Sequence, residues 1–156
     1  YIITIYYKRI MPRRLVVILQ RRFLMSSYNF KVDVSCVIKK DYGFLLIKRA
    51  DDEEVFPGYW GIPGGTVEPA DATLEDALVR ECEEEVGVEI TNLEIVSNDI
   101  NDKGEKGALY IVYKADYMAG EPKALDGTAE AKWLSIDDAR TLNLTPKTLE
   151  MLEVCL

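Results

Sequence analysis

Residues 80–88 read RECEEEVGV, and this stretch carries the strongest information about the fold. Its acids Glu81, Glu84 and Glu85 recur at spacings of three and four, which brings them to one side of a helix. Carboxylates that close repel each other unless a cation lies between them. Hard divalent ions such as Mg²⁺ prefer oxygen ligands of this kind, and Mn²⁺ accepts them as a substitute. The stretch therefore predicts a helix that carries a divalent-metal site.

A helical wheel at about 100° per residue tests whether these acids merely face solvent. Glu81 and Glu85 fall inside the apolar stripe of the wheel, whereas Glu84 lies at its edge and Arg80 on the opposite, solvent side. Burying carboxylates without a partner is costly, so a metal site is favoured over a wet face. The apolar positions that form the stripe are Leu74, Ala77, Leu78, Cys82 and Val86.

The ends of this helix are marked by capping residues. Thr73 is a suitable N-cap, and two acids follow it in the first turn, where they complement the helix dipole. Gly87 stands where a glycine ends a helix, which predicts a helix over residues 74–86. Before it, residues 57–65 read PGYWGIPGG, too rich in glycine and proline for regular structure. Such a loop lets the backbone approach a ligand closely.

Together, the loop and the helix resemble the Nudix hydrolase family, whose box reads G-x5-E-x7-R-E-U-x-E-E-x-G-U with U aliphatic. Residues 80–88 match the second half of the box in register, with Cys82 at an aliphatic position. The resemblance extends from about Tyr28 to Leu156 and includes the Trp133–Leu134 pair. It implies an α/β fold, the Nudix α/β/α sandwich with a mixed β-sheet.

The first half of the box departs from the family pattern. Gly65 lies fifteen residues before Arg80, where the family has fourteen, so one residue is inserted. We expect the insertion near Ala72, in the loop, where extra length costs little and the helix spacing is untouched. Asp71 is the best counterpart of the first Glu of the box. Arg80 is expected to anchor the loop through Glu68 or Asp71.

The resemblance implies a Mg²⁺-dependent pyrophosphohydrolase that cleaves the P–O–P bond of a nucleoside diphosphate linked to another moiety, as in nucleoside triphosphates or nucleotide sugars. The bound ions would bridge phosphate oxygens and orient a water for attack. A further acid from a distant loop often acts as base or ligand, and Glu105 and Glu130 are the candidates. The irregular first half of the box leaves open a non-catalytic module that binds a nucleotide or metabolite. The implied metal ligands are Glu81, Glu84, Glu85 and the carbonyl of Gly64.

Candidate substrate contacts lie between the expected second strand and the box. Arg49, at the end of that strand, could reach a phosphate, with plain solvation as the competing role. Phe56, Tyr59 and Trp60 could stack on a nucleobase, because aromatic faces suit bases. For Trp60, packing in the core is an equal alternative. The expected partner is thus a small phosphorylated molecule.

Composition narrows the chemistry and the partners. The 156 residues contain no histidine, which excludes Ser-His-Asp and Cys-His nucleophilic schemes and His-bound transition metals. The first 24 residues hold six of the 19 basic residues and no acid, leaving 13 basic against 27 acidic residues, a net of −14, in the remainder. Such an acidic domain repels nucleic-acid polymers. The three scattered cysteines fit a cytoplasmic setting rather than a disulfide framework. The sequence leaves open whether two copies of the chain form a homodimer.

Residues 1–24 form a basic and apolar N-terminal segment. Their longest apolar run, residues 15–19, is too short to span a bilayer, and no small-residue cleavage site follows. We favour an upstream extension or an artefact over a transit peptide. The domain is then expected to occupy residues 25–156, so that a protein beginning at Met25 would fold and work unchanged.

Around the box, alternating and apolar runs predict strands, and polar or glycine-containing stretches predict turns. A turn at residues 41–43 joins the first two strands into a hairpin. A mobile loop over residues 98–107 is expected between the third and fourth strands. The predicted strands are 32–38, 43–49, 93–97, 108–115 and 132–134, and the predicted later helices are 137–142 and 146–154, the last with Thr145 as N-cap.

Overall fold

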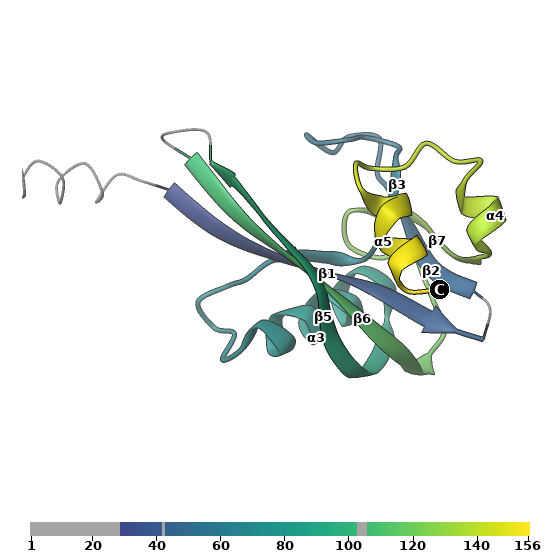
Figure 1. Cartoon of the computed structure of the whole chain (residues 1–156), viewed down its shortest axis with the longest axis horizontal. Coiled ribbons are helices and arrows are strands. Elements are labelled where there is room, and N and C mark those ends of the chain that lie inside the picture. The colour runs from purple at the N-terminus through teal and green to yellow at the C-terminus, as the bar shows by residue number, and fades with distance from the viewer. Residues whose placement is uncertain (1–28, 42, 103–105) are drawn as a thin grey trace, which may run out of the picture.

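The computed structural model of the chain describes residues 29–41, 43–102 and 106–156 (Figure 1). The N-terminal segment and Glu105 lie outside the described residues. In chain order the elements are β1 (Asn29–Lys40), β2 (Gly43–Arg49), β3 (Trp60–Gly61), β4 (Gly64–Thr66), α3 (Leu74–Val86), β5 (Val88–Asp102), β6 (Lys106–Gly120), β7 (Thr128–Leu134), α4 (Ile136–Ala139) and α5 (Thr148–Val154).

The described strands form one mixed sheet of seven, with the central order β3-β2-β1-β6-β5. β1 and β6 run parallel, and the other pairs are antiparallel. β6 pairs with one edge of β1 over nearly the whole length of β1. The other edge is shared, because β2 pairs with residues 39–40 of β1 and β4 pairs with residues 33–35. This sharing brings the glycine strand β4 in beside α3.

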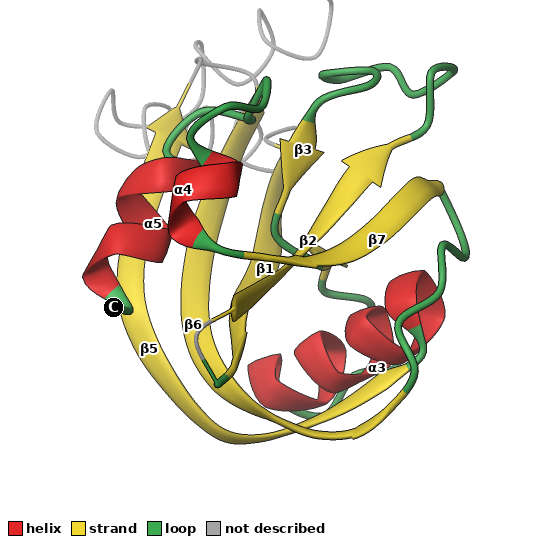
Figure 2. Ribbon diagram, turned by 90° about the vertical axis from the view of Figure 1, so that its right-hand side faces the viewer, coloured by secondary structure: helices red, strands yellow, loops and turns green. Residues whose placement is uncertain are grey.

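Helices cover both faces of the sheet, as Figure 2 shows. Along β2, Leu45 and Ile47 pack on the side of α3, whereas Phe44 and Leu46 pack on the side of α4 and α5. This alternation follows from the two-residue period of a strand. The predicted α/β/α sandwich with a mixed sheet is confirmed. No helix among the described residues is long and apolar enough to cross a membrane.

α3 begins and ends where the capping residues predict. The Thr73 side chain accepts a hydrogen bond from the Asp76 N–H, which satisfies one of the free amides of the first turn. Gly87 adopts a left-handed φ of 68°, and its N–H bonds back to the last turn, so the helix stops there. The buried residues of the helix are Ala77, Leu78, Cys82 and Val86, all from the predicted apolar stripe.

The prediction of a mobile loop over residues 98–107 is wrong for most of that range. β5 continues to Asp102 and β6 starts at Lys106, with Ile100 opposite Leu109. In Figure 1 the paired ends of β1, β6 and β5 project beyond α3. Cross-strand backbone bonds hold this extension whatever the polarity of its side chains, so the polar composition misled the prediction.

Three further predictions need correction, the first two because of contacts with distant parts of the chain. The segment 57–65 was expected to lack regular structure, yet β3 and β4 form within it because β2 and β1 offer pairing edges. The last helix starts at Thr148 rather than at 146. The Thr145 N–H donates to the Trp60 carbonyl at 2.8 Å and Leu144 bridges to Trp60, which keeps this stretch extended. α4 ends at Ala139, earlier than the predicted 142.

Candidate functional site

The three box acids lie along the last turns of α3. Glu81 and Glu85 are partly buried against the body of the protein, whereas Glu84 is exposed. The side chain of Glu81 retains 14% of its accessible area and that of Glu84 retains 52%. The wheel prediction of two inward acids and one at the edge is therefore confirmed.

The glycine strand β4 packs directly on these acids. The Gly64 N–H donates a hydrogen bond to Glu85 Oε2 at 2.9 Å. A Cβ at Gly65 would lie 2.5 Å from the carboxylate atoms of Glu81, and one at Gly64 would lie 2.2 Å from the Val34 carbonyl oxygen. Both positions need glycine because β4 is wedged between β1 and α3. The predicted role of the Gly64 carbonyl as a metal ligand stays a prediction.

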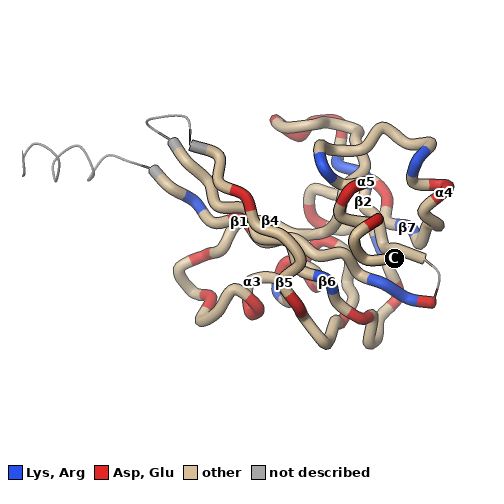
Figure 3. The backbone as a smooth tube through the Cα atoms, in the orientation of Figure 1, with Lys and Arg blue, Asp and Glu red and all other residues tan. Residues whose placement is uncertain are grey.

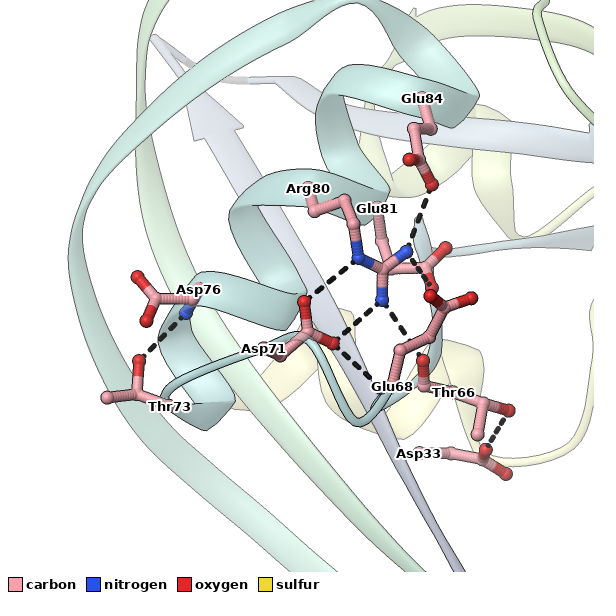
Figure 4. Close-up of polar contacts among 9 residues, drawn as sticks. All are labelled: Asp33, Thr66, Glu68, Asp71, Thr73, Asp76, Arg80, Glu81 and Glu84. Carbon is pink, nitrogen blue, oxygen red and sulfur yellow. Dashed lines mark hydrogen bonds and ion pairs between the residues drawn. The ribbon is translucent and has the colours of Figure 1, made fainter.

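Arg80 ties the loop before α3 to the helix, as Figure 4 shows. Its Nε and Nη2 donate to the two carboxylate oxygens of Asp71, both at 3.0 Å, and Nη2 also donates to the Thr66 carbonyl. Asp71 in turn accepts the Glu68 N–H at 2.7 Å. The structure thus selects Asp71 over the Glu68 side chain as the anchor. The hydrogen bonds from Arg80 lower the pKa of Asp71.

The solvent-side placement predicted for Arg80 is wrong for its guanidinium. Nη1 reaches Glu81 Oε1 at 2.9 Å and Glu84 Oε2 at 3.0 Å, and the side chain is only 24% exposed. The long stem lets the charged group lie far from its own Cα, and a residue four positions on is a neighbour on a helix. Arg80 therefore supplies the positive charge between two of the predicted metal ligands.

The donor set has the oxygen chemistry that suits Mg²⁺, but its geometry in this structure is arranged around Arg80. Within residues 29–41, 43–102 and 106–156, no three Asp, Glu, His or Cys side chains are placed to hold one ion together. Glu85 points at the Gly64 amide instead of at Glu84. Closing the carboxylates around an ion would need the Arg80 side chain to change its rotamer and release both Glu81 and Glu84.

Burial and neighbouring charges shift the pKa values of Glu81 and Glu85. Burial raises the pKa of Glu85 to about 7, and the charges of Glu81 and Asp126 act in the same direction. The hydrogen bond from Gly64 and the charge of Arg49 oppose this rise. Burial also raises the pKa of Glu81. A cation beside these groups would favour their ionised forms, so the site is built to gain from binding one.

The side chain of Glu130 lies on the face of the sheet opposite to α3, and its predicted catalytic role stays a prediction. It lies on β7 opposite Lys48, whose Nζ donates to it at 3.2 Å, and Lys132 also pairs with it. Lys132 lies over the ring of Trp60, on the side of α4 and α5. Alternate residues of a strand share a face, so Glu130 points away from α3. The hydrogen bonds from Lys132 and Lys48 lower its pKa.

The guanidinium of Arg49 is engaged by the loop that follows β2, and its charge also acts on Glu85, so its role as a phosphate ligand stays a prediction. Nε donates to the Val55 carbonyl at 2.7 Å, and Nη2 donates to Glu53 Oε2 at 2.5 Å. The Arg49 backbone also closes the loop, because its N–H donates to Tyr59 and its carbonyl accepts from Gly58. Arg49 organises the loop over residues 50–59.

The three aromatic candidates divide into two groups. Phe56 and Tyr59 are 41% and 40% exposed, and their ring centroids lie 5.8 Å apart. Trp60 is only 8% exposed and packs in the core beneath α4 and α5. For Trp60 the core role is therefore the one the structure supports, since a ring in that core cannot stack on a substrate. Phe56 and Tyr59 remain available at the surface.

Sequence reasoning missed the segment before β7, which docks on the end of α3. The Leu125 N–H donates to the Glu85 carbonyl at 3.0 Å, and the Lys123 N–H donates to the Val86 carbonyl at 3.1 Å. The Asp126–Gly127 pair is a turn signal that could have pointed here, and Gly127 has a φ of 63°. A pocket of about 480 Å³ lies between this segment and the loop after β2.

Comparisons with known proteins agree with this architecture. The family model described as NUDIX domain matches residues 29–155. The nucleoside triphosphatase NudI of Escherichia coli strain K12 is 44% identical over 85 residues, which cover 49% of this chain and 60% of that protein.

Solved structures extend the similarity over more of the chain. The crystal structure of the MutT NUDIX hydrolase from Burkholderia pseudomallei has a TM-score of 0.70 at 30% identity, covering 82% of this chain and 99% of that one. The solution structure of the E. coli ORF135 protein has a TM-score of 0.67 at 28% identity, covering 83% and 91%. With its match from β1 to the end of α5, the chain belongs to the NUDIX domain family.

Proposed function

We propose that the chain is a Mg²⁺-dependent pyrophosphohydrolase that cleaves a P–O–P bond of a nucleotide. The observation that carries this proposal is the packing of the glycine strand β4 on Glu81 and Glu85 of α3. The match to a protein named nucleoside triphosphatase supports a nucleoside triphosphate as substrate. The chain spans about 60% of the length of that relative, so the activity is argued from the site of this chain.

Glu81, Glu84 and Glu85 would hold the metal, whose charge would neutralise phosphate oxygens and lower the pKa of a bound water. Of the three, the Glu85 carboxylate is held in place by the backbone, because the Gly64 N–H donates a hydrogen bond to one of its oxygens. Arg80 keeps the loop closed on the helix through Asp71, and its bonds to Glu81 and Glu84 compensate their charges until a cation replaces it.

Phe56 and Tyr59 would contact the nucleobase. Both rings are exposed on the loop that Arg49 organises, and base stacking on an aromatic ring tolerates any base. Phe56 has a φ of 52°, an uncommon conformation for a residue with a side chain. The contacts of Arg49 with Val55 and Glu53 hold the loop in this conformation.

A second candidate is a module of the same fold that binds a nucleotide without hydrolysing it. One observation favours it, namely that Arg80 occupies the space between Glu81 and Glu84. If Arg80 held this position against Mg²⁺, Glu81 and Glu84 would keep the guanidinium as their partner and could not bind a metal ion. The two candidates differ in product formation and not in nucleotide affinity.

A substrate panel separates the two candidates. Ribonucleoside and deoxyribonucleoside triphosphates, nucleotide sugars and ADP-ribose are incubated with the protein and Mg²⁺ in ¹⁸O-labelled water, and products are resolved by mass spectrometry. Hydrolysis of at least one nucleotide, lost on chelation, supports the enzyme, and the labelled product identifies the phosphorus that water attacks. Calorimetric binding of a nucleotide without any product would instead establish the binding module.

A further inference from the structure

The projecting end of β5 is a free edge of the sheet. β5 is the last strand in the sheet order, and β6 is the one described strand with which it pairs. Residues 98–101 are all exposed, although the side chains of a strand alternate between its two faces. Both faces of this stretch are therefore open in the part of the chain that the structure describes. Such an edge presents backbone N–H and C=O groups with which another strand can pair.

The first part of β5 is protected against such pairing, whereas its end is not. Three irregularities interrupt the register with β6 between Glu89 and Ser97, and bulges of this kind turn an edge away from a partner. From Ser97 onward the register runs to the end of the strand without a shift. Residues 97–101 include no proline and no lysine, the residues that commonly block an edge. This end of the strand is thus suited to pairing.

The side chains at this edge differ between the two faces of the sheet. Ile100 pairs with Leu109, which packs against the core on the side of α3, so Ile100 lies on that face beyond the helix and is 64% exposed. Asp99 pairs with Tyr110 on the other face, where Lys147 neutralises its charge. Figure 3 shows that most of the projecting backbone is tan, which marks uncharged residues. The edge therefore combines an exposed apolar side chain with little net charge.

We propose that two copies of the chain pair edge to edge through residues 97–101 of β5, in an antiparallel arrangement that joins their sheets. A two-fold axis perpendicular to the joined sheet keeps α3 of both copies on the same face. Residues directly opposite each other also share a face, so the axis passes beside a residue that meets its own copy. An axis at Asp99 would oppose two carboxylates, which is unfavourable. An axis at Ile100 instead brings two isoleucines together.

The polar side chains fit the same register. With the axis at Ile100, Asn101 lies opposite Asp99 of the second copy, on the face away from α3. The Asn101 amide can donate a hydrogen bond to that carboxylate, one oxygen of which is held by Lys147. The pairing is reciprocal, because a two-fold axis repeats each contact. No like charges oppose each other among residues 98–101 in this register.

A strand of a different protein is the competing occupant of a free edge. Its sequence would be independent of this chain, whereas the side chains of residues 98–101 complement their own copy when the axis lies at Ile100. That self-complementarity favours a second copy. The contact between two short strands is small, so we expect a weak dimer with a dissociation constant on the order of 10–100 µM. The proposal is independent of the catalytic activity.

Sedimentation velocity of the full chain over a range of concentrations measures the association. Ile100→Lys places two like charges beside the axis and should raise the dissociation constant of the dimer at least about tenfold. Ile95→Lys is the matched control, because Ile95 is an isoleucine of the same strand, is 51% exposed and lies before the last irregularity of register. This control should leave the dissociation constant within about twofold of the wild type. Both positions are exposed, and circular dichroism checks that the variants fold.

Disulfide cross-linking tests the register. Opposite residues of antiparallel strands have Cα atoms about 4.5–5.5 Å apart, a separation that a disulfide spans. Ile100→Cys should therefore give a cross-linked dimer with diamide. Asn98→Cys should not, because its copy lies several residues away along the partner strand. The wild type controls for the native thiols, of which Cys36 and Cys82 are buried and Cys155 is half-buried.

The outcomes separate the possible occupants of the edge. A wild type that stays monomeric at every concentration, or an Ile100→Lys variant that associates as the wild type does, would overturn the proposal. Equal weakening by Ile95→Lys, or stronger cross-linking at residue 98 than at residue 100, would contradict the stated contact. Hydrogen exchange of the amides of residues 98–101 completes the test. Protection that rises with protein concentration supports the dimer, whereas protection independent of concentration would assign the edge to a segment of the same chain and refute it.

Discussion

At the scale of single residues, the site depends on two adjacent glycines with different neighbours. Gly64 has a φ of 147° and faces backbone atoms of β1, whereas Gly65 faces the flexible end of the Glu81 side chain. Backbone cannot move away from an added methyl group without disturbing the sheet, but a carboxylate can turn aside. The two positions are therefore needed for different reasons, one for the fold and one for the site.

Alanine substitutions at these glycines should separate stability from activity. Gly64→Ala is expected to lower the free energy of unfolding by roughly 2–4 kcal/mol, since it combines an unfavourable φ with a backbone clash. Gly65→Ala should change stability by much less yet reduce phosphate release, because Glu81 must leave its position. Urea unfolding followed by circular dichroism, together with turnover assays, checks both. Equal loss of stability in the two variants would contradict the assignment.

The raised pKa of Glu85 predicts that the stability of the metal-free protein depends on pH. This pKa rises from the ordinary 4.5 to about 7 on folding, so the native state holds the proton more tightly than the unfolded state. The resulting stabilisation is complete below about pH 4.5 and is lost as pH rises through 7. At 1.36 kcal/mol per pKa unit, a rise of about 2.5 units corresponds to roughly 3 kcal/mol. Glu85→Gln should show a flatter profile than the wild type between pH 5 and 7 in chelator, and parallel profiles would refute the shift.

At the scale of elements, α3 could be predicted from the sequence because residues within its own turns determine where it begins and ends. Thr73 and Gly87 act within their own turns, and the apolar stripe repeats inside the helix. The start of α5 could not be read in this way, because the backbone of Trp60 holds Thr145 from far along the chain. The burial of Trp60 and the lysine partners of Glu130 are likewise set by strand pairing that the local pattern does not specify.

The N-cap of α3 gives a test at this scale. Thr73→Ala is expected to lower the free energy of unfolding by about 1 kcal/mol, since the Asp76 N–H loses its acceptor. Thr73→Ser keeps the hydroxyl and should stay within a few tenths of a kcal/mol of the wild type. Thermal and urea unfolding of the three proteins provide the comparison. An alanine variant as stable as the serine variant would show that the cap contributes nothing.

At the scale of the whole molecule, the sheet separates two layers with different tasks. The layer that holds α3 carries the box acids, and the layer that holds α4 and α5 carries Trp60, Met151 and Leu152 in its core. The sequence predicted both layers from the order of strands and helices. It did not predict the pocket, because the segment before β7 reaches α3 through backbone hydrogen bonds that the local sequence does not specify.

Substitutions at Trp60 test this separation. Trp60→Ala should lower the free energy of unfolding by about 3–5 kcal/mol, as for loss of a large buried aromatic ring. Trp60→Phe should lower the melting temperature less and leave kcat/KM for the best substrate within about twofold, because the ring has no part in stacking. A phenylalanine variant with normal stability and a tenfold higher KM would instead show that Trp60 contacts the substrate.

The central claim is that the acids of α3 perform metal-dependent hydrolysis. The most direct measurement is phosphate-anhydride turnover with Mg²⁺ for the wild type, Glu85→Gln and Glu83→Gln, where Glu83 is an exposed acid of the same helix outside the predicted ligand set. We predict roughly 100-fold or greater loss of kcat in Glu85→Gln with an intact circular dichroism spectrum, and normal turnover in Glu83→Gln. Equal turnover in all three proteins, or turnover that persists in chelator, would contradict the claim.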